Sequence, residues 1–284
     1  MLGDEPSRTA LPGARRLRAR HEDRAVERGR PRCPETRGWR CGAACGRREV
    51  HYANEYADHE TDALTDDTPF SGGSGALART GLPRSLALRA GIAALVAGSV
   101  VALIGIALDH LPRLAVTLLA VIAWFGWQYS VGPLQLAWRG WGELDNAALD
   151  GLVLPAYGTA VLNGSVAKTL LACLPLFLVV FANLLATQWP DRRPDAAVGK
   201  RTLVTRWSPR RLKLLYVGAV YLAFGTLPVL AGGALPAVVA AASAVVLPVS
   251  VWDAAGYTER RVPFPSVAAM VALVVVQLLA WCGV

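Results

Sequence analysis

Long apolar runs dominate residues 86–284, whereas residues 1–85 are mostly polar and charged. Seven of these runs have about 18–23 residues, the length that a helix needs to cross a bilayer. The pattern predicts an all-α fold, a multi-span bundle of transmembrane helices. The expected spans are residues 86–108, 111–130, 144–163, 167–189, 213–232, 235–252 and 265–284. The third is the weakest because polar side chains interrupt it, and a re-entrant or interfacial segment is the alternative there.

Basic residues divide the predicted loops into two unequal sets. When the seven spans are threaded in order, fourteen of the sixteen Lys and Arg after position 50 fall on one side. Only Arg113 and Lys168 fall on the other side. Because Lys and Arg accumulate in cytoplasmic loops, we expect a multi-pass protein of the cell membrane, embedded in the lipid bilayer. The segments expected in the cytoplasm are the polar stretch before residue 86 and the loops 131–143, 190–212 and 253–264.

The net charge of +8 arises mainly in residues 1–50. This segment has 13 Arg, no Lys and 7 acidic residues, whereas the rest of the chain has 16 Lys and Arg against 14 acidic residues. No basic stripe with interleaved aromatic residues occurs in that remainder, so nucleic acid is not an expected partner.

An acidic repeat occupies the polar stretch before the first predicted span. Asn54, Asp58 and Asp62 recur every four residues, so on a helix they share one face. Carboxylates in this arrangement repel each other, and a divalent cation bound between them would remove the repulsion. Mg²⁺ suits such a site because it prefers one or two carboxylates together with water and phosphate oxygens.

The longest predicted cytoplasmic loop repeats this four-residue spacing. Asp191 and Asp195 are followed by Gly199, which lets the backbone approach a phosphate, and by Lys200, which supplies positive charge. Asn183 lies two helical turns before Asp191. A single D-x₃-D pattern recurs by chance in solvated loops, but two copies on the same predicted membrane face indicate one site for Mg²⁺ and a diphosphate.

These motifs resemble those of the UbiA superfamily of membrane prenyltransferases. The resemblance runs from about residue 51 to the C-terminus. It is carried by the segments 54–62 (N-x₃-D-x₃-D), 68–74 (TPFSGGS) and 191–203 (D-x₃-D-x₃-GKRTL). The segments 139–143 (RGWGE) and 199–203 (GKRTL) look most like the branch that prenylates 1,4-dihydroxy-2-naphthoate in menaquinone biosynthesis.

The resemblance implies Mg²⁺-dependent transfer of a polyprenyl group from a polyprenyl diphosphate to an aromatic acceptor. It implies that oxygen ligands from both motifs hold two Mg²⁺ ions, and that the four aspartates are the catalytic residues. The implied metal ligands are Asn54, Asp58, Asp62, Asp191 and Asp195.

The resemblance also implies substrate-binding roles for residues near these motifs. Lys200, Arg201 and Arg192 would neutralise the departing diphosphate, and Arg139 and Glu143 would lie near the acceptor. The family often has an asparagine where this chain has Thr187; either Asn183, one turn earlier, replaces it, or that ligand is absent. Five aromatic residues could shelter a carbocation, but packing or an interfacial belt also explains them, so none is assigned: Trp124, Trp127, Tyr129, Tyr157 and Phe181.

Residues 1–50 depart from the family pattern. Family members typically have nine helices, so two apolar spans are expected before or within the first acidic motif, and residues 1–50 contain none. We expect a UbiA-like domain at residues 51–284, and we hypothesise that residues 1–50 arise from an out-of-frame or misassigned start. A genuine disordered tail is the alternative, since the composition also fits that.

Three other functions stay open at this point. The protein could be a UbiA-type enzyme with another aromatic or lipid acceptor, or an inactive remnant that lacks two helices. It could also be a transporter, because Asp145, Asp150 and Lys168 in the predicted spans could mark a polar path. Against transport, the spans show no internal repeat, and the acidic motifs lie in loops rather than at the bilayer midplane.

Overall fold

The computed structural model describes residues 51–284 except residue 63, residues 65–76 and residues 78–79. The described residues all belong to one compact unit. They contain helices and no β-strand, so the prediction of an all-α fold is confirmed for this part of the chain. The hypotheses about residues 1–50 and the segment 68–74 lie outside the described residues, as does the side chain of Asp62.

Helices occupy all seven positions where the sequence predicts a span. They are α5 (Ser85–Ala107), α6 (Arg113–Ser130), α8 (Gly142–Ala148) with the π-helical η1 (Leu149–Val153) and α9 (Leu154–Val161), α10 (Val166–Ala172), α11 (Leu174–Gln188), α14 (Pro209–Leu230), α15 (Ala237–Ala244), α16 (Leu247–Gly256) and α17 (Phe264–Cys282). Shorter helices lie in the connections, namely α3 (His59–Asp62), α7 (Leu136–Arg139), α12 (Arg192–Ala197), α13 (Leu203–Arg206) and the 3₁₀ turn η2 (Tyr257–Glu259).

Four of the described helical segments are long and apolar enough to cross a membrane. They are Ser85–Ala107, Pro209–Leu230, Ala237–Glu259 and Phe264–Cys282. The pair α10 and α11, bent by 48° at its junction, would form a fifth span. α6 and the stretch from α8 to α9 do not meet the same criterion, and the latter carries three acidic residues. A multi-pass membrane protein is thus supported, and seven spans stay a prediction.

Prolines account for the breaks within these helices. Pro175 and Pro248 are the second residues of α11 and α16, directly after the junctions with α10 and α15. Proline has no N–H to donate and its ring clashes with the preceding turn, so it is tolerated at the start of a helix and disrupts its interior. The sequence therefore divides two of the expected spans into shorter helices.

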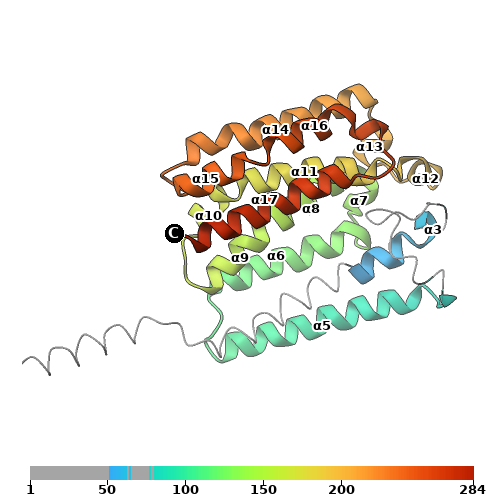
Figure 1. Cartoon of the computed structure of the whole chain (residues 1–284). Helices are drawn as coiled ribbons and strands as arrows, with labels where there is room; N and C mark the ends of the chain where they lie inside the picture. Colours follow the sequence, from blue (N-terminus) through green and yellow to red (C-terminus); the bar gives the residue numbers. More distant parts are fainter. Residues whose placement is uncertain (1–50, 63, 65–76, 78–79) are drawn as a thin grey trace, which may run out of the picture. The chain divides into compact units, whose positions relative to one another are not determined.

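α11 lies within the bundle, in contact with α14, α17, α8 and η1. Figure 1 shows α11 between α14 on one side and α6 on the other. Leu185, Leu212 and Tyr216 are nearly inaccessible in the core between α11 and α14. Gly151 permits η1 to approach α11, because a Cβ at this position would lie 2.5 Å from the Cα of Phe177. This packing fixes the ends of α8 and α11, which lead into the polar connections.

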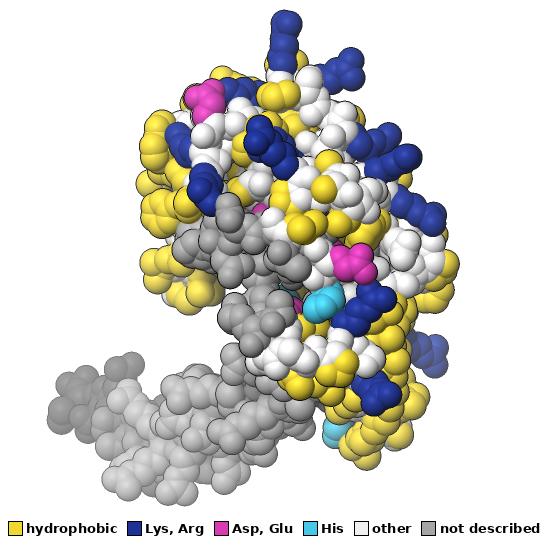
Figure 2. All heavy atoms as spheres, turned by 90° about the vertical axis from the view of Figure 1, so that its right-hand side faces the viewer, with side chains coloured by type: hydrophobic (Ala, Val, Ile, Leu, Met, Phe, Trp, Pro, Cys, Tyr) yellow, Lys and Arg dark blue, Asp and Glu magenta, His cyan; other side chains and the backbone are white. Residues whose placement is uncertain are grey.

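Much of the apolar surface faces outward. Only 11% of the apolar window of α5 is buried, and Leu103 and Leu279 are 63% and 66% exposed. Large exposed apolar surfaces are unusual on soluble monomers, whereas lipid chains are a favourable environment for them. The flanks of the molecule are accordingly hydrophobic in Figure 2.

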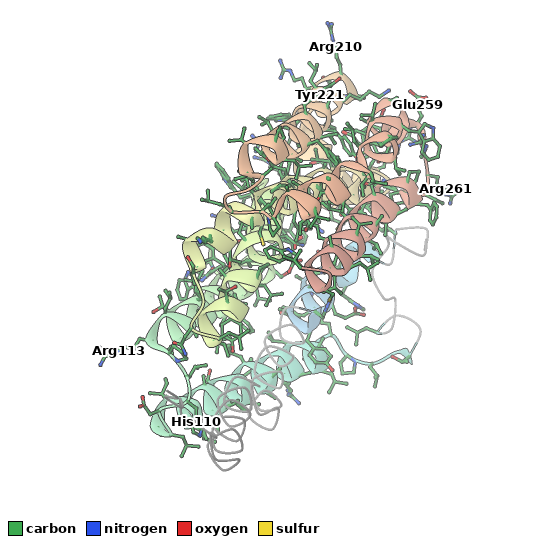
Figure 3. The ribbon with its side chains drawn as sticks, turned by 60° about the vertical axis from the view of Figure 1, so that its left-hand side comes forward. His110, Arg113, Arg210, Tyr221, Glu259 and Arg261 are labelled. Carbon is green, nitrogen blue, oxygen red and sulfur yellow. The ribbon has the colours of Figure 1, made fainter. Side chains whose placement is uncertain are left out.

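Charge gathers at one end of the bundle. α3, α12 and α13 lie at this end in Figure 1, and Lys and Arg side chains crowd it in Figure 2. Figure 3 shows Arg113 at the opposite end from Arg210 and Arg261. Arg113, predicted to lie on one side of the membrane, is therefore far from Arg210 and Arg261, predicted to lie on the other. That the basic end faces the cytoplasm stays a prediction.

Candidate active site

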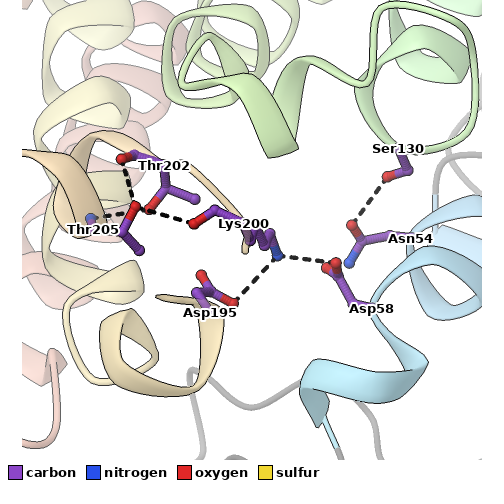
Figure 4. Close-up of polar contacts among 7 residues, drawn as sticks. All are labelled: Asn54, Asp58, Ser130, Asp195, Lys200, Thr202 and Thr205. Atoms are coloured by element: carbon purple, nitrogen blue, oxygen red, sulfur yellow. Dashed lines mark hydrogen bonds and ion pairs between the residues drawn. The ribbon is translucent and has the colours of Figure 1, made fainter. Parts of the chain in front are cut away.

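The two acidic motifs meet at Lys200. Its Nζ lies 2.9 Å from Oδ1 of Asp58 and 3.6 Å from Oδ1 of Asp195 (Figure 4). The side chains of Lys200, Asp58 and Asp195 are only 12%, 10% and 6% exposed. Segments far apart in the sequence therefore place two carboxylates and one ammonium group together, largely shielded from water.

Local backbone geometry brings Lys200 back against α12. Gly199 has a φ of +83°, a conformation that glycine adopts without the strain of a Cβ. The chain reverses there, and the N–H of Lys200 donates to the carbonyl of Asp195 at 2.9 Å. On its other side the carbonyl of Lys200 accepts from Oγ1 of Thr205 at 3.1 Å, and Oγ1 of Thr202 caps α13 (Figure 4).

The segment 139–143 holds this loop in place. The N–H of Arg201 donates to the carbonyl of Trp138 at 3.0 Å. Oε1 of Glu143, a fully buried side chain, accepts from the N–H of Leu203 at 2.7 Å. Gly140 has a φ of +85°, and a Cβ there would lie 2.9 Å from the carbonyl oxygen of Arg201. The segments RGWGE and GKRTL are therefore in direct contact.

The first acidic motif is fastened to the end of α6. Residues 51–57 are helical, and the N–H of Asp58 donates to the carbonyl of Asn54 at 2.8 Å. Oδ1 of Asn54 accepts a hydrogen bond from Oγ of Ser130 at 3.1 Å (Figure 4). Asn54 and Asp58 thus sit one helical turn apart, and the site includes the polar end of a predicted span.

A cavity of about 650 Å³ adjoins the first motif. Asn54 is part of its wall, together with polar residues of α8 and α6, two of which are Asn146 and Tyr129. Leu119, Ile122, Leu149, Leu154 and the ring of Tyr157 form much of the rest. The cavity combines a polar region beside the acidic motif with an apolar one.

Other predicted site residues lie around α12. Asp191 immediately precedes this helix, and its carbonyl accepts from the N–H of Asp195 at 2.9 Å. The guanidinium of Arg192 lies 3.8 Å from the centre of the Trp189 ring. Asn183 is buried in α11, and its Oδ1 has no hydrogen-bond partner among the described residues.

Arg139 and Arg201 also lie in this region, and both are exposed. Arg139 ends α7, and Arg201 follows Lys200 in the loop before α13. In the described part of the chain, neither guanidinium forms an ion pair with an acidic side chain.

Burial and neighbouring charges shift the ionisation of this cluster. Burial raises the pKa of Asp195 to about 6; the charge of Lys200 opposes the rise, and that of Asp58 adds to it. Burial lowers the pKa of Lys200, but the carboxylates of Asp58 and Asp195 outweigh it, and this pKa lies above its ordinary value. Lys200 therefore stays charged at neutral pH, between two carboxylates.

The donor groups at this cluster suit a hard divalent cation. Two carboxylate oxygens lie within 3.6 Å of one nitrogen, so a single cation could contact both, and Mg²⁺ favours such oxygens. Among the described residues no three acidic, His or Cys side chains are close enough to form a complete metal site. Asp58 and Asp195 would hold the ion, and Lys200 would have to move from between them.

Two residues of the site, Ser130 and Trp138, were not identified from the sequence, and Tyr129 was considered there but not assigned. Ser130 and Tyr129 lie at the end of the second predicted span, and Trp138 precedes the RGWGE segment. The Nζ of Lys200 lies 6.0 Å from the centre of the Trp138 ring. For Ser130 and Trp138, the only sequence signal was the proximity of Trp138 to a segment singled out by resemblance.

Comparison with known proteins identifies the family. A model of the UbiA prenyltransferase family matches residues 41–270. No curated protein and no solved structure gives a significant match. The matched region covers most of the chain and includes Asn54, Asp58, Asp195 and Lys200. This chain therefore belongs to the UbiA prenyltransferase family.

Proposed function

We propose that this protein transfers a polyprenyl group from a polyprenyl diphosphate to an aromatic acceptor in a Mg²⁺-dependent reaction. The supporting observation is that Asp58 and Asp195, from two distant acidic motifs, meet at Lys200. The proposed acceptor is 1,4-dihydroxy-2-naphthoate, because the segments 139–143 and 199–203 resemble the branch that uses it. The basic end of the bundle, which carries these motifs, would face the cytoplasm.

Each group in the cluster has a defined part in this proposal. When bound, Mg²⁺ would stabilise negative charge on the leaving diphosphate, with Asp58 and Asp195 as its ligands. The ammonium of Lys200 and the guanidinium of Arg201 add positive charge from the same loop. Glu143 contacts the backbone of this loop through Leu203, so it would position Lys200 and Arg201 without touching the substrate.

The cavity of about 650 Å³ would hold the reacting groups. Its leucine and isoleucine side chains suit the isoprenoid chain. Aromatic ring faces attract cations, so Tyr129 and Tyr157 could shelter the allylic cation that forms as the diphosphate leaves. Oxygens of Asp145 and Asn146 could accept hydrogen bonds from hydroxyl groups of an acceptor. An electron-rich ring held there would attack the cation, and loss of its carboxylate would complete transfer to a naphthoate.

A transfer assay on the full chain tests this proposal. Radiolabelled polyprenyl diphosphate and a panel of acceptors are incubated with the protein in nanodiscs, with Mg²⁺ or with EDTA. We expect a prenylated dihydroxynaphthalene, formed with loss of CO₂, only with Mg²⁺. We expect a loss of at least about 100-fold in Asp58→Asn, the scale of removing an electrostatic contact to the transition state. Asp109→Asn is a matched control, since this exposed aspartate lies next to His110 at the opposite end (Figure 3).

Three results would contradict this proposal in different ways. Prenylation of another acceptor would exclude the naphthoate assignment alone. An equal loss of transfer activity in Asp58→Asn and Asp109→Asn would show that transfer does not depend on the acidic cluster. Passage of the polyprenyl diphosphate across sealed vesicles without product formation would favour a transporter.

A further inference from the structure

A second polar hollow, of about 390 Å³, lies at the basic end of the bundle. Its walls come from the start of α12 and the turn before it, from η2 and the residues that follow it, and from Leu64. Four arginines line it in two adjacent pairs, Arg192 with Arg193 and Arg260 with Arg261. Four arginines from two distant parts of the chain therefore border one space.

The two inner guanidiniums are held in place by aromatic rings and hydrogen bonds. Arg192 stacks on Trp189 and donates to its carbonyl at 3.0 Å. Arg260 lies 4.5 Å from the ring centre of Trp252. Its Nη1 also donates to Oδ1 of the fully buried Asp253 at 2.6 Å. Because these contacts fix the side chains before any ligand arrives, binding would require little further ordering.

Acidic groups at the hollow leave an excess of positive charge. Asp191 and Glu259 are the acidic residues in the wall. Glu259 forms an ion pair of 2.9 Å with Lys213, which brings a fifth cation near the rim. Asp253 also balances the charge of Arg260, so five cations near the hollow face three acidic groups. An anion between the arginines would relieve their mutual repulsion.

We propose that this hollow binds a phosphate-bearing anion through Arg192, Arg193, Arg260 and Arg261. Guanidinium groups match phosphate oxygens in pairs, which makes arginine the side chain best suited to this ligand. Two sources share that chemistry: an anionic phospholipid headgroup, and inorganic diphosphate released by the reaction. The second source rests on the proposed function.

The position of the hollow suits both sources. Arg261 lies three residues before Phe264, the start of the membrane-spanning α17, so the hollow lies where lipid headgroups are expected. Asp191, which lines the hollow, precedes the helix that carries Asp195. The hollow therefore adjoins the helix that carries one carboxylate of the acidic cluster.

Binding of two probes by matched variants tests this inference. Arg193→Gln/Arg261→Gln removes the two exposed arginines of the hollow, and Arg89→Gln/Arg211→Gln removes two exposed arginines that do not line it. One arm titrates inorganic diphosphate into the full chain in neutral detergent by calorimetry. The other compares the chain's thermal stabilisation in nanodiscs of phosphatidylglycerol with that in phosphatidylcholine.

We expect at least one probe to bind wild type and the control alike, and to bind Arg193→Gln/Arg261→Gln about tenfold more weakly, the scale of one charge-assisted hydrogen bond. Loss in the calorimetric arm identifies diphosphate, and loss in the nanodisc arm identifies lipid. Equal binding by all three proteins would mean general charge attraction and would overturn the inference. Absence of binding by either probe would also overturn it. Neither result would bear on prenyl transfer, which is measured separately.

Discussion

Replacement of Lys200 by methionine removes the cation between the acidic motifs. Methionine keeps a flexible apolar chain near Trp138 but has no charge. Asp58 and Asp195 then face each other across a site where their side chains are only 10% and 6% exposed. Breaking a buried ion pair in this way typically costs about 3–5 kcal/mol.

Proton uptake limits the loss of stability. The pKa of Asp195 is about 6 while Lys200 opposes its rise, so it is higher in Lys200→Met. Protonation of Asp195 in the variant at pH 7.5 therefore costs at most about 2 kcal/mol, less than leaving the buried carboxylate unpaired. We therefore expect Lys200→Met to lower the free energy of unfolding by about 2–3 kcal/mol at pH 7.5. The loss should decrease towards pH 6, where the proton is taken up more readily. Mg²⁺ should stabilise the variant more than wild type, because both carboxylates are then available to it.

Thermal unfolding in detergent, followed by tryptophan fluorescence, measures these effects. The series compares wild type, Lys200→Met and Lys168→Met, each with EDTA and with Mg²⁺. Lys168 is an exposed lysine of α10, so its replacement controls for the loss of one charge. Equal midpoints for Lys200→Met and Lys168→Met, with the same response to Mg²⁺, would refute the claim that Lys200 balances two buried carboxylates.

Three further predictions follow from the packing and ionisation of the site. The folded chain keeps a proton on Asp195 up to about pH 6, whereas the unfolded chain loses it near 3.8. The free energy of unfolding should therefore rise as pH falls through 6, by on the order of 3 kcal/mol in total relative to Asp195→Asn. Equal dependence of the unfolding free energy on pH in wild type and Asp195→Asn would contradict this. Glu143→Ala should destabilise the protein by about 1–3 kcal/mol, because it leaves the Leu203 N–H unpaired, and it should reduce transfer. Glu143→Gln can still accept that hydrogen bond and should restore both stability and transfer. Equal losses in the two variants would contradict a positioning role for Glu143. Gly151→Ala should lower stability by about 1–3 kcal/mol because its Cβ would clash with Phe177. Gly158→Ala should not, since a Cβ at Gly158 has no neighbouring atom within 4 Å. Equal thermal midpoints for the two variants would show that η1 can move aside.

Apolar periodicity located the helices well because a bilayer span needs one long uninterrupted run. It could not place the breaks, which depend on where proline removes a donor within a run, as at Pro175 and Pro248. The π-helical η1 was also beyond reach, since the close contact of Gly151 with α11 is a tertiary feature. Spacing alone could suggest that two acidic motifs share a site, because each motif repeats every four residues beside an expected span.

The internal contacts of the site were harder to infer. Nothing in the spacing of Asp58, Asp195 and Lys200 indicates that the lysine lies between the two carboxylates, because that depends on the backbone reversal at Gly199. The contact of Glu143 with Leu203 joins two segments that resemblance had marked separately. Arg260 was placed only in a cytoplasmic loop, since its anchoring by Asp253 and Trp252 requires the fold of α16.

Manganese binding tests the central claim that the two acidic motifs share a cation. Mn²⁺ favours the same oxygen ligands as Mg²⁺, and its electron paramagnetic resonance signal reports how much is bound in the presence of inorganic diphosphate. The account predicts that wild type and Asp109→Asn bind the ion, and that Asp58→Asn and Asp195→Asn each lose most of it. Full retention of bound Mn²⁺ by either of the last two variants would contradict a shared site.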